Sequence, residues 1–387
     1  MAYDWSDVVS AEKREDRRTV REFPCGASVH RQNRSLIVTP PSGGWRALST
    51  GSFNGGFMSS PSAVFNTTSI GGRAEYASMG RPKEFHDMRT REYARFLGLD
   101  PDSTVGLGTA AHMDNAATGT AEADGIEVSA VITGGIRGNG GRAGDPAGFD
   151  EMERNLSQSG TIVIILIIDA DLPDSALLGA VMTATEAKSR TLLRLMGKSL
   201  YSKGFATGSG TDQVAVLCNK GGGRAVEGYC NGSPLAGAIR ECVEGTLAKA
   251  LDNQTMMNPE AECNPYLMAS RHKITEADCH NEIRYPFRMK ALKEGRNRLS
   301  RDARAAATVS AVLHIMDEAE WGMISPETAA EACKGVLLSV MMGAPSLKDP
   351  VLRRRFEMAD TPAEILSLSM AMMLFDRATE IDAEGSP

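Results

Sequence analysis

The run Thr161-Ile-Val-Ile-Ile-Leu-Ile-Ile168 decides the fold class of this 387-residue chain. Its apolar, mostly β-branched residues are continuous, which indicates a strand buried on both faces, and it is too short to span a membrane. The segment 175–196 that follows has the spacing of an amphipathic helix. A strand buried on both faces and followed by a helix predicts a sheet that is covered by helices.

Shorter strands are expected on both sides of this run. The segments typical of strands are 35–38, 45–48, 63–65, 105–107, 126–132 and 213–218. The segments typical of helices are 84–98, 284–318, 325–342 and 347–378, with breaks near Pro326, Pro345 and Pro362. We therefore expect an α+β protein with a mixed, mostly antiparallel sheet packed with helices, followed by a helical C-terminal region. Residues 1–258 are predicted to form a catalytic domain, and residues 259–387 a mainly helical extension.

The helix expected at 175–196 carries a candidate catalytic carboxylate. Its predicted apolar stripe consists of Leu178, Val181, Met182, Leu192, Leu193 and Met196. Glu186 lies at the border of this stripe, where partial burial would suit it to act as a general base. The alternative is an exposed Glu186 that pairs with Arg190.

A glycine-rich segment, Ala206-Thr-Gly-Ser-Gly-Thr-Asp212, leads into the strand expected at 213–218. Gly208 and Gly210 would allow a positive φ or a close approach to a ligand. Successive N–H groups in such a turn can hold an oxyanion. The Gly-Lys-Ser/Thr of a P-loop is missing, and an ordinary tight turn is the alternative.

Two further polar segments lie upstream. The first contains His112, Asp114 and Asn115, of which His112 and Asp114 could form an acid–base pair. The second is rich in glycine and contains side chains suited to anions or amides, namely Arg137, Asn139, Arg142 and Asp145. Neither segment has a recognised zinc signature, and we expect no metal site.

Composition narrows the class of protein. The net charge of −7 argues against nucleic acid as the main partner. Seven cysteines without framework spacing favour reduced thiols and a cytoplasmic location. The first residues lack the apolar segment of a signal peptide, and no stretch is long enough to span a membrane. Methionine-rich stripes in the C-terminal helices are typical of core or subunit contacts, so a homo-oligomer could form through them.

Taken in this order and spacing, the polar segments resemble the adenosylcobinamide amidohydrolase family. The resemblance is carried by Gly160-Thr-Ile-Val-Ile-Ile, Met182-Thr-Ala-Thr-Glu-Ala-Lys188, Ala206-Thr-Gly-Ser-Gly-Thr-Asp212, Ala111-His-Met-Asp-Asn115, Asn139-Gly-Gly-Arg-Ala-Gly-Asp-Pro146 and Gly232-Ser-Pro-Leu-Ala-Gly-Ala-Ile-Arg240. It covers roughly Trp45 to Leu251. Two departures are Ser209, where Thr is expected more often, and the helical extension after about Asn258.

The resemblance implies hydrolysis of the amide that joins the aminopropanol arm to the corrin ring of adenosylcobinamide. The products would be adenosylcobyric acid and aminopropanol. The cobalt belongs to this small-molecule corrinoid substrate, so no cofactor of the protein itself is expected. Among the side chains, we expect Glu186 to activate water, and Lys188, Asp212 and His112 to orient the substrate or the leaving amine.

The remaining candidate residues are expected to bind substrate. They are Asp114, Asn115, Arg137, Asn139, Arg142, Asp145, Thr185, Thr207, Gly208, Ser209, Gly210 and Thr211. A nucleophilic Ser209 or Thr211 is an alternative to activated water. Two other functions stay open: a non-catalytic corrinoid-binding or sensor protein, and an amidase for another bulky, cofactor-like amide.

Overall fold

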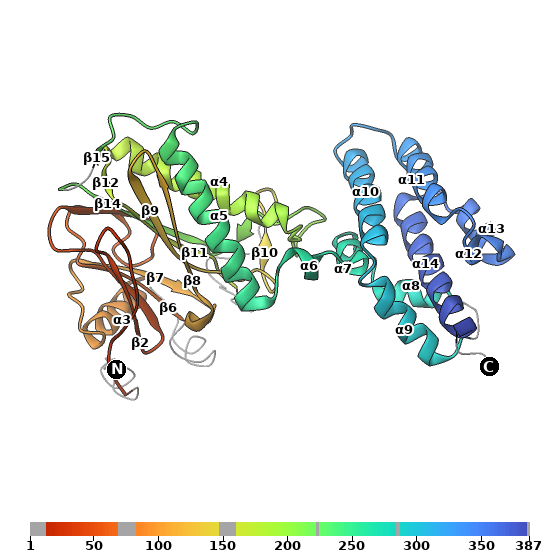
Figure 1. The fold of residues 1–387 in the computed structure, drawn as a ribbon, viewed down its shortest axis with the longest axis horizontal. Coiled ribbons are helices and arrows are strands. Elements are labelled where there is room, and N and C mark those ends of the chain that lie inside the picture. The colour runs from red at the N-terminus through yellow and green to blue at the C-terminus, as the bar shows by residue number, and fades with distance from the viewer. Residues whose placement is uncertain (1–12, 69–82, 147–159, 222–223, 284–286, 385–387) are drawn as a thin grey trace. The chain divides into compact units, whose positions relative to one another are not determined.

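The computed structural model describes residues 13–68, 83–146, 160–221, 224–283 and 287–384. The chain divides into two compact units, Met1–Asn258 and Pro259–Pro387 (Figure 1). The first twelve residues, which bear on the signal-peptide prediction, lie outside the described ranges.

The first unit contains two large sheets. The five-stranded sheet has the order β1-β2-β3-β6-β7, with bounds Arg18–Glu22, Ser28–Gln32, Ser35–Thr39, Ala63–Thr68 and Thr104–Thr109. The six-stranded sheet has the order β5-β4-β14-β11-β9-β8, with bounds Gly56–Met58, Trp45–Ser49, Gln213–Asn219, Val163–Ile168, Ile126–Thr133 and Ala117–Ala123. Within these two sheets only the β6–β7 and β11–β14 pairs are parallel. The predicted mixed, mostly antiparallel α+β fold is therefore confirmed.

The two sheets and their helices form four layers (Figure 1). Helix α3 (Lys83–Phe96) packs on the five-stranded sheet, and helices α4 (Asp174–Arg194) and α5 (Pro234–Thr255) cover the six-stranded sheet. Strand β11 explains this order of layers, because its side chains point alternately into two different cores. Val163, Ile165 and Ile167 fill the space between the sheets, and Ile164, Leu166 and Ile168 fill the space beneath α4 and α5.

The predicted apolar stripe of α4 was wrong for half of its six members. Leu178, Met182 and Leu193 are 57%, 66% and 46% exposed. The face that is buried instead consists mainly of small side chains, namely Ala176, Leu177, Ala180, Thr183, Ala184, Ala187, Lys188, Thr191 and Leu192. Alanines allow α4 and α5 to approach closely, so here small side chains decide which face is buried, whereas hydrophobicity alone favours the large ones. The helix also begins after Pro173, without a side-chain cap.

The second unit is entirely helical in its described part. Its helices α6 to α14 are Pro259–Glu262, Pro265–Ala269, Glu276–Glu282, Met289–Leu299, Ala303–Glu320, Pro326–Met341, Pro345–Lys348, Pro350–Met358 and Pro362–Glu384. The helix expected at 284–318 is divided before α10, and the helix expected at 347–378 is divided before α13. The break predicted near Pro362 is confirmed, because α14 begins there. Asp302 caps the start of α10, and Asp349 caps the start of α13. A new series of helical backbone hydrogen bonds begins after each of these caps.

Buried contacts hold the helical unit together. The methionines of α14, including Met370 and Met372, lie in its core. Arg271 donates to both carboxylate oxygens of the buried Asp317, at 2.7 and 2.8 Å. No helix in the described ranges is long and apolar enough to cross a membrane.

Asp376 of α14 makes the stability of the helical unit depend on pH. It accepts hydrogen bonds from the backbone N–H and the hydroxyl of Ser346, at 2.7 and 2.9 Å, but burial still raises its pKa to about 6. Its ordinary pKa is 3.8, so between about pH 4 and 6 the folded protein keeps a proton that the unfolded chain has lost. The contribution of Asp376 to stability therefore falls as the pH rises through this window.

We expect Asp376→Asn to stabilise the protein, relative to the wild type, more at about pH 7.5 than at about pH 4.5. The asparagine stays neutral, so the variant avoids the buried charge that forms at the higher pH. Urea titration at the two pH values measures the difference in the free energy of unfolding. An equal difference at both pH values would contradict the account.

Candidate functional site

At one end of the first unit, the space between the two sheets changes from apolar to polar. Side chains alternate between the two faces of a strand. The residue two positions before or after an inward apolar residue therefore also faces inward. Val131 is followed in this way by Thr133, and Ala215 is preceded by Gln213. The side chains that share this position are Ser49, Asn66, Thr109, Thr133, Thr161 and Gln213. We call this set, with the turn 207–212 beside it, the polar end.

Hydrogen bonds join the two sheets at the polar end. The buried Asn66 donates from Nδ2 to Thr133 Oγ1 at 2.9 Å. The backbone N–H of Gly108 donates to Gln213 Oε1 at 3.0 Å. Since an N–H donates to oxygen, this bond fixes the orientation of the Gln213 amide, and its Nε2 has no hydrogen-bond partner among the described residues. The polar end thus presents an oriented N–H donor.

The parallel pairing of β11 and β14 brings the start of both strands together, with Val163 opposite Gln213. The residues just before these strands therefore meet. Asp212 Oδ1 accepts from the backbone N–H of Ile162 at 2.9 Å, and Thr211 Oγ1 lies 2.7 Å from Thr161 Oγ1.

Asp212 is the centre of this network. Lys188 Nζ, from α4, donates to Asp212 Oδ2, and the two side chains are only 11% and 9% exposed. Ser209 donates twice, from Oγ to Oδ1 at 2.6 Å and from its backbone N–H to Oδ2 at 2.9 Å. With the N–H of Ile162, four donors occupy the roughly four lone-pair positions of a carboxylate. Asp212 is therefore an anchor that holds Lys188 and Ser209 in place.

Gly208 is needed for a close approach and not for a positive φ. Neither Gly208 nor Gly210 has a positive φ, so that part of the prediction was wrong. A Cβ on Gly208 would overlap Asp212 Oδ2 and lie 2.7 Å from Lys188 Nζ. Gly208–Ser209 forms β13, which pairs with β10 (Gly140–Gly141), and the backbone N–H of Thr207 donates to Gly141 O at 2.9 Å.

Glu186 and Thr185 lie outside this network. Both are exposed on α4, so the expected partial burial of Glu186 was wrong. Glu186 accepts from Asn231 Nδ2 at 2.8 Å, while Arg190 pairs with Glu244 at 2.7 Å, so the alternative pairing was wrong as well. Burial of the alanine face of α4 turns Glu186 outward and Lys188 inward.

The segment after β7 does not form the expected acid–base pair. The backbone N–H of His112 and the side chain of Asn115 both donate to Gln254 Oε1, at 3.1 and 2.9 Å. Asp114 is exposed and pairs with Arg31 at 3.3 Å. His112 is exposed too, and no contact joins its ring to Asp114 in the described structure.

The second glycine-rich segment folds against neighbouring loops. Asn139 is buried and donates from Nδ2 to Gly160 O, directly before Thr161. Burial opposes ionisation of Asp145, but hydrogen bonds from Ser199 Oγ at 2.6 Å and from the N–H of Arg142 at 2.8 Å outweigh it and lower the pKa of Asp145. The side chains of Arg137 and Arg142 are exposed. Asn139 alone of this group reaches the base of the polar end.

Several residues of the polar end were not singled out from the sequence. They are Ser49, Asn66, Thr109, Thr133, Thr161 and Gln213. Their position in the sequence could have identified them, because each residue begins or ends a run in which every second residue is apolar and faces inward. Among the described residues, no group of three or more His, Cys, Asp or Glu side chains is arranged to hold a metal ion.

The two glycines of the turn test the anchoring role of Asp212. Gly208→Ala should push Asp212 and Lys188 apart and lower the free energy of unfolding by about 1–3 kcal/mol. Gly210→Ala is the matched control, because a Cβ there meets nothing within 4 Å, and its effect should stay within about 0.5 kcal/mol. Denaturant titration measures both. Equal losses in the two variants would contradict a network centred on Asp212.

The first unit matches a known family. The family described as adenosylcobinamide amidohydrolase matches residues 21–259. A protein of Methanosarcina mazei named adenosylcobinamide amidohydrolase is 32% identical over 198 residues, which cover 48% of this chain and 74% of that protein. A Halobacterium salinarum protein of the same name is 28% identical over 134 residues, which cover 35% of this chain and 54% of that protein.

An uncharacterized protein of Methanocaldococcus jannaschii is 33% identical over 173 residues, which cover 41% of this chain and 66% of that protein. The chain thus spans 66% and 54% of the length of the M. jannaschii and H. salinarum relatives. The family match covers more than half of the chain and includes every strand of the polar end. The chain belongs to the adenosylcobinamide amidohydrolase family.

Proposed function

We propose that this protein hydrolyses the amide between the corrin ring and the aminopropanol arm of adenosylcobinamide, giving adenosylcobyric acid and aminopropanol. The observation that carries the proposal is the family match over residues 21–259, which contains the whole polar end. Water is the second reactant, and hydrolysis of an amide in water needs no coupling to ATP.

Amide hydrolysis requires a nucleophile at the carbonyl carbon, donors for the oxyanion that forms, and a proton for the leaving amine. Gln213 suits the second task, because the N–H of Gly108 fixes its amide and leaves the Nε2 hydrogens for a ligand. A donor that is already oriented stabilises developing negative charge without a reorganisation cost.

Ser209 and Glu186 offer two routes for the attack. Ser209 Oγ donates its proton to Asp212 Oδ1 at 2.6 Å, and Lys188 holds the other carboxylate oxygen. A hydroxyl positioned in this way can attack the carbonyl carbon while Asp212 takes its proton. The C–N bond then breaks, aminopropanol leaves with that proton, and water hydrolyses the acyl-enzyme. Glu186 could instead activate water, which would require the scissile amide to reach the outer side of α4. The geometry favours Ser209, because it shares the Asp212 network with Lys188 and lies in the turn that leads directly into Gln213.

The helical unit lies beyond the family match. A substrate with a different amide is therefore the alternative to adenosylcobinamide. A panel of amides tests this directly. Turnover of adenosylcobinamide, with no turnover of other bulky amides, supports the proposal. Binding of the corrinoid without product, even at high protein concentration, would favour a sensor.

Purified protein should release aminopropanol from adenosylcobinamide without ATP. We expect Ser209→Ala to lower kcat by about 10²- to 10⁴-fold and Glu186→Gln to keep most of the activity. Chromatography of adenosylcobyric acid measures the rates, and melting temperatures show that both variants fold. The reverse pattern, with the loss in Glu186→Gln, would assign the attack to activated water on α4.

Gln213→Glu isolates the proposed oxyanion donor. The carboxylate can still accept from the N–H of Gly108, but it has no N–H to offer the substrate. We expect kcat to fall by about 10²- to 10³-fold with a small change in KM, since the contact strengthens in the transition state. A variant with unchanged kcat would remove Gln213 from the reaction.

A further inference from the structure

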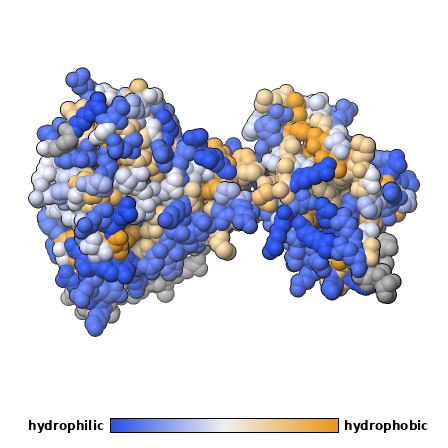
Figure 2. Space-filling model, in the orientation of Figure 1, coloured by the Kyte–Doolittle hydropathy of each residue, from blue (hydrophilic) through white to orange (hydrophobic). Residues whose placement is uncertain are grey.

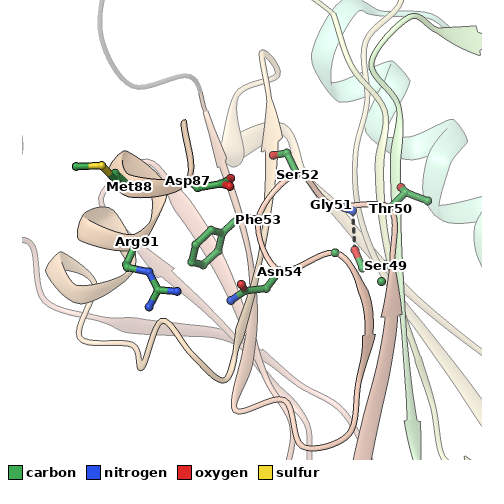
Figure 3. A pocket seen from close by; sticks show the side chains of 11 residues that line it. Ser49, Thr50, Gly51, Ser52, Phe53, Asn54, Asp87, Met88 and Arg91 are labelled. Atoms are coloured by element: carbon green, nitrogen blue, oxygen red, sulfur yellow. Dashed lines mark hydrogen bonds between the residues drawn. The ribbon is translucent and has the colours of Figure 1, made fainter. Parts of the chain in front are cut away.

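A hollow of about 470 Å³ lies between α3 and the Ser49–Gly56 segment (Figure 3). Its lining includes Ser49, Thr50, Ser52, Asn54, Asp87 and Arg91. Ser49 also belongs to the polar end, and Thr50 donates from its backbone N–H to Val214 O, next in sequence to Gln213. The hollow and the polar end therefore share Ser49.

The wall formed by Ser49–Gly56 has a fixed shape. A Cβ on Gly51 would lie 2.7 Å from Gly106 O, and a Cβ on Gly55 would overlap Gly51 O. Asn54 has a φ of 50°, which its side chain compensates by donating to Pro101 O at 2.7 Å and to Thr104 O at 2.8 Å. Close backbone contacts and a strained, well-bonded residue indicate a wall that is formed before any ligand arrives.

The opposite wall carries a carboxylate oxygen without a partner. Asp87 Oδ1 is buried and has no hydrogen-bond partner among the residues that the structure describes. In Figure 3 the carboxylate points from α3 toward the segment that contains Ser52 and Phe53. Arg91, one turn further along, is engaged elsewhere, because it donates to Asp102 at 2.5 Å and lies 5.8 Å from the centre of the Phe53 ring.

A buried oxygen without a donor is costly, so its presence in a preformed hollow points to a ligand that supplies an N–H group. We propose that the hollow binds an N–H donor of the corrinoid at Asp87, which makes Asp87 a substrate-binding residue. This inference rests on the proposed function. The volume is at the low end for ligand pockets, so it suits one side arm and not the whole ring system.

Two parts of the reaction carry the required N–H group. One is a carboxamide on the rim of the corrin ring, and the other is the amino group of the aminopropanol that leaves. An amide needs only an acceptor, which Asp87→Asn retains. An ammonium needs the negative charge, which Asp87→Asn and Asp87→Ala both remove.

The test measures adenosylcobinamide binding by equilibrium dialysis, its KM and kcat, and inhibition by aminopropanol. We expect Asp87→Ala to weaken the binding of either adenosylcobinamide or aminopropanol by about 10- to 100-fold, with kcat largely retained. If the hollow holds a ring carboxamide, corrinoid binding weakens in Asp87→Ala and much less in Asp87→Asn. If it holds the leaving amine, inhibition by aminopropanol weakens equally in both variants.

Glu92→Gln is the matched control. It removes one negative charge from the same helix, but Glu92 pairs with Arg95 and does not line the hollow. Unchanged binding of both ligands in a folded Asp87→Ala variant would overturn the proposal, as would an equal effect in Glu92→Gln. Dialysis needs no turnover, so a protein that binds adenosylcobinamide through Asp87 without hydrolysing it would refute the proposed function and leave the hollow as the binding site.

Discussion

Burial of β11 on both faces is the constraint on which the rest of the first unit depends. Side chains 162–168 are all buried and alternate between the core shared by the sheets and the core beneath the helices. A parallel neighbour for such a strand requires a crossover, and α4 supplies it between β11 and β14. That connection returns the chain to the end where β11 begins. Asp212 therefore meets Ile162, and Lys188 reaches Asp212 from the helix above.

The same geometry explains why polar groups collect at one end of the sandwich. The inward rows of β4, β6, β7, β11 and β14 are apolar in the core, and at this end hydroxyl and amide side chains replace the aliphatic ones. Their burial is tolerated because they bond across the sheets, as Asn66 does with Thr133 and Gly108 with Gln213. Among the described residues, Gln213 Nε2 keeps unused capacity as a donor, and Asn66 Oδ1, Asn139 Oδ1 and Asp87 Oδ1 keep it as acceptors. Gln213 and Asp87 are the pair that we assign to the substrate. An amide substrate offers a carbonyl oxygen and N–H groups, which complement this pair.

Features set by local composition could be predicted, and those set by contacts between distant segments could not. The buried strand and the turn before β14 follow from continuous β-branched residues and glycine density. The inward face of α4 does not, because alanines, which carry a weak hydrophobic signal, pack against α5 while Met182 is exposed. The prediction for Glu186 depended on the same choice of buried face, and Glu186 lies on the exposed side of α4. Gln213 has no motif, since its role depends on Gly108, 105 residues away.

The central claim is that the scissile amide binds at the polar end, between the two sheets. A crystal structure of the Ser209→Ala variant with adenosylcobinamide tests it most directly. The account predicts the amide carbonyl oxygen within about 2.7–3.1 Å of Gln213 Nε2, the range expected for an oxyanion donor. An amide bound instead beside Glu186 and Asn231, on the outer side of α4, would contradict it.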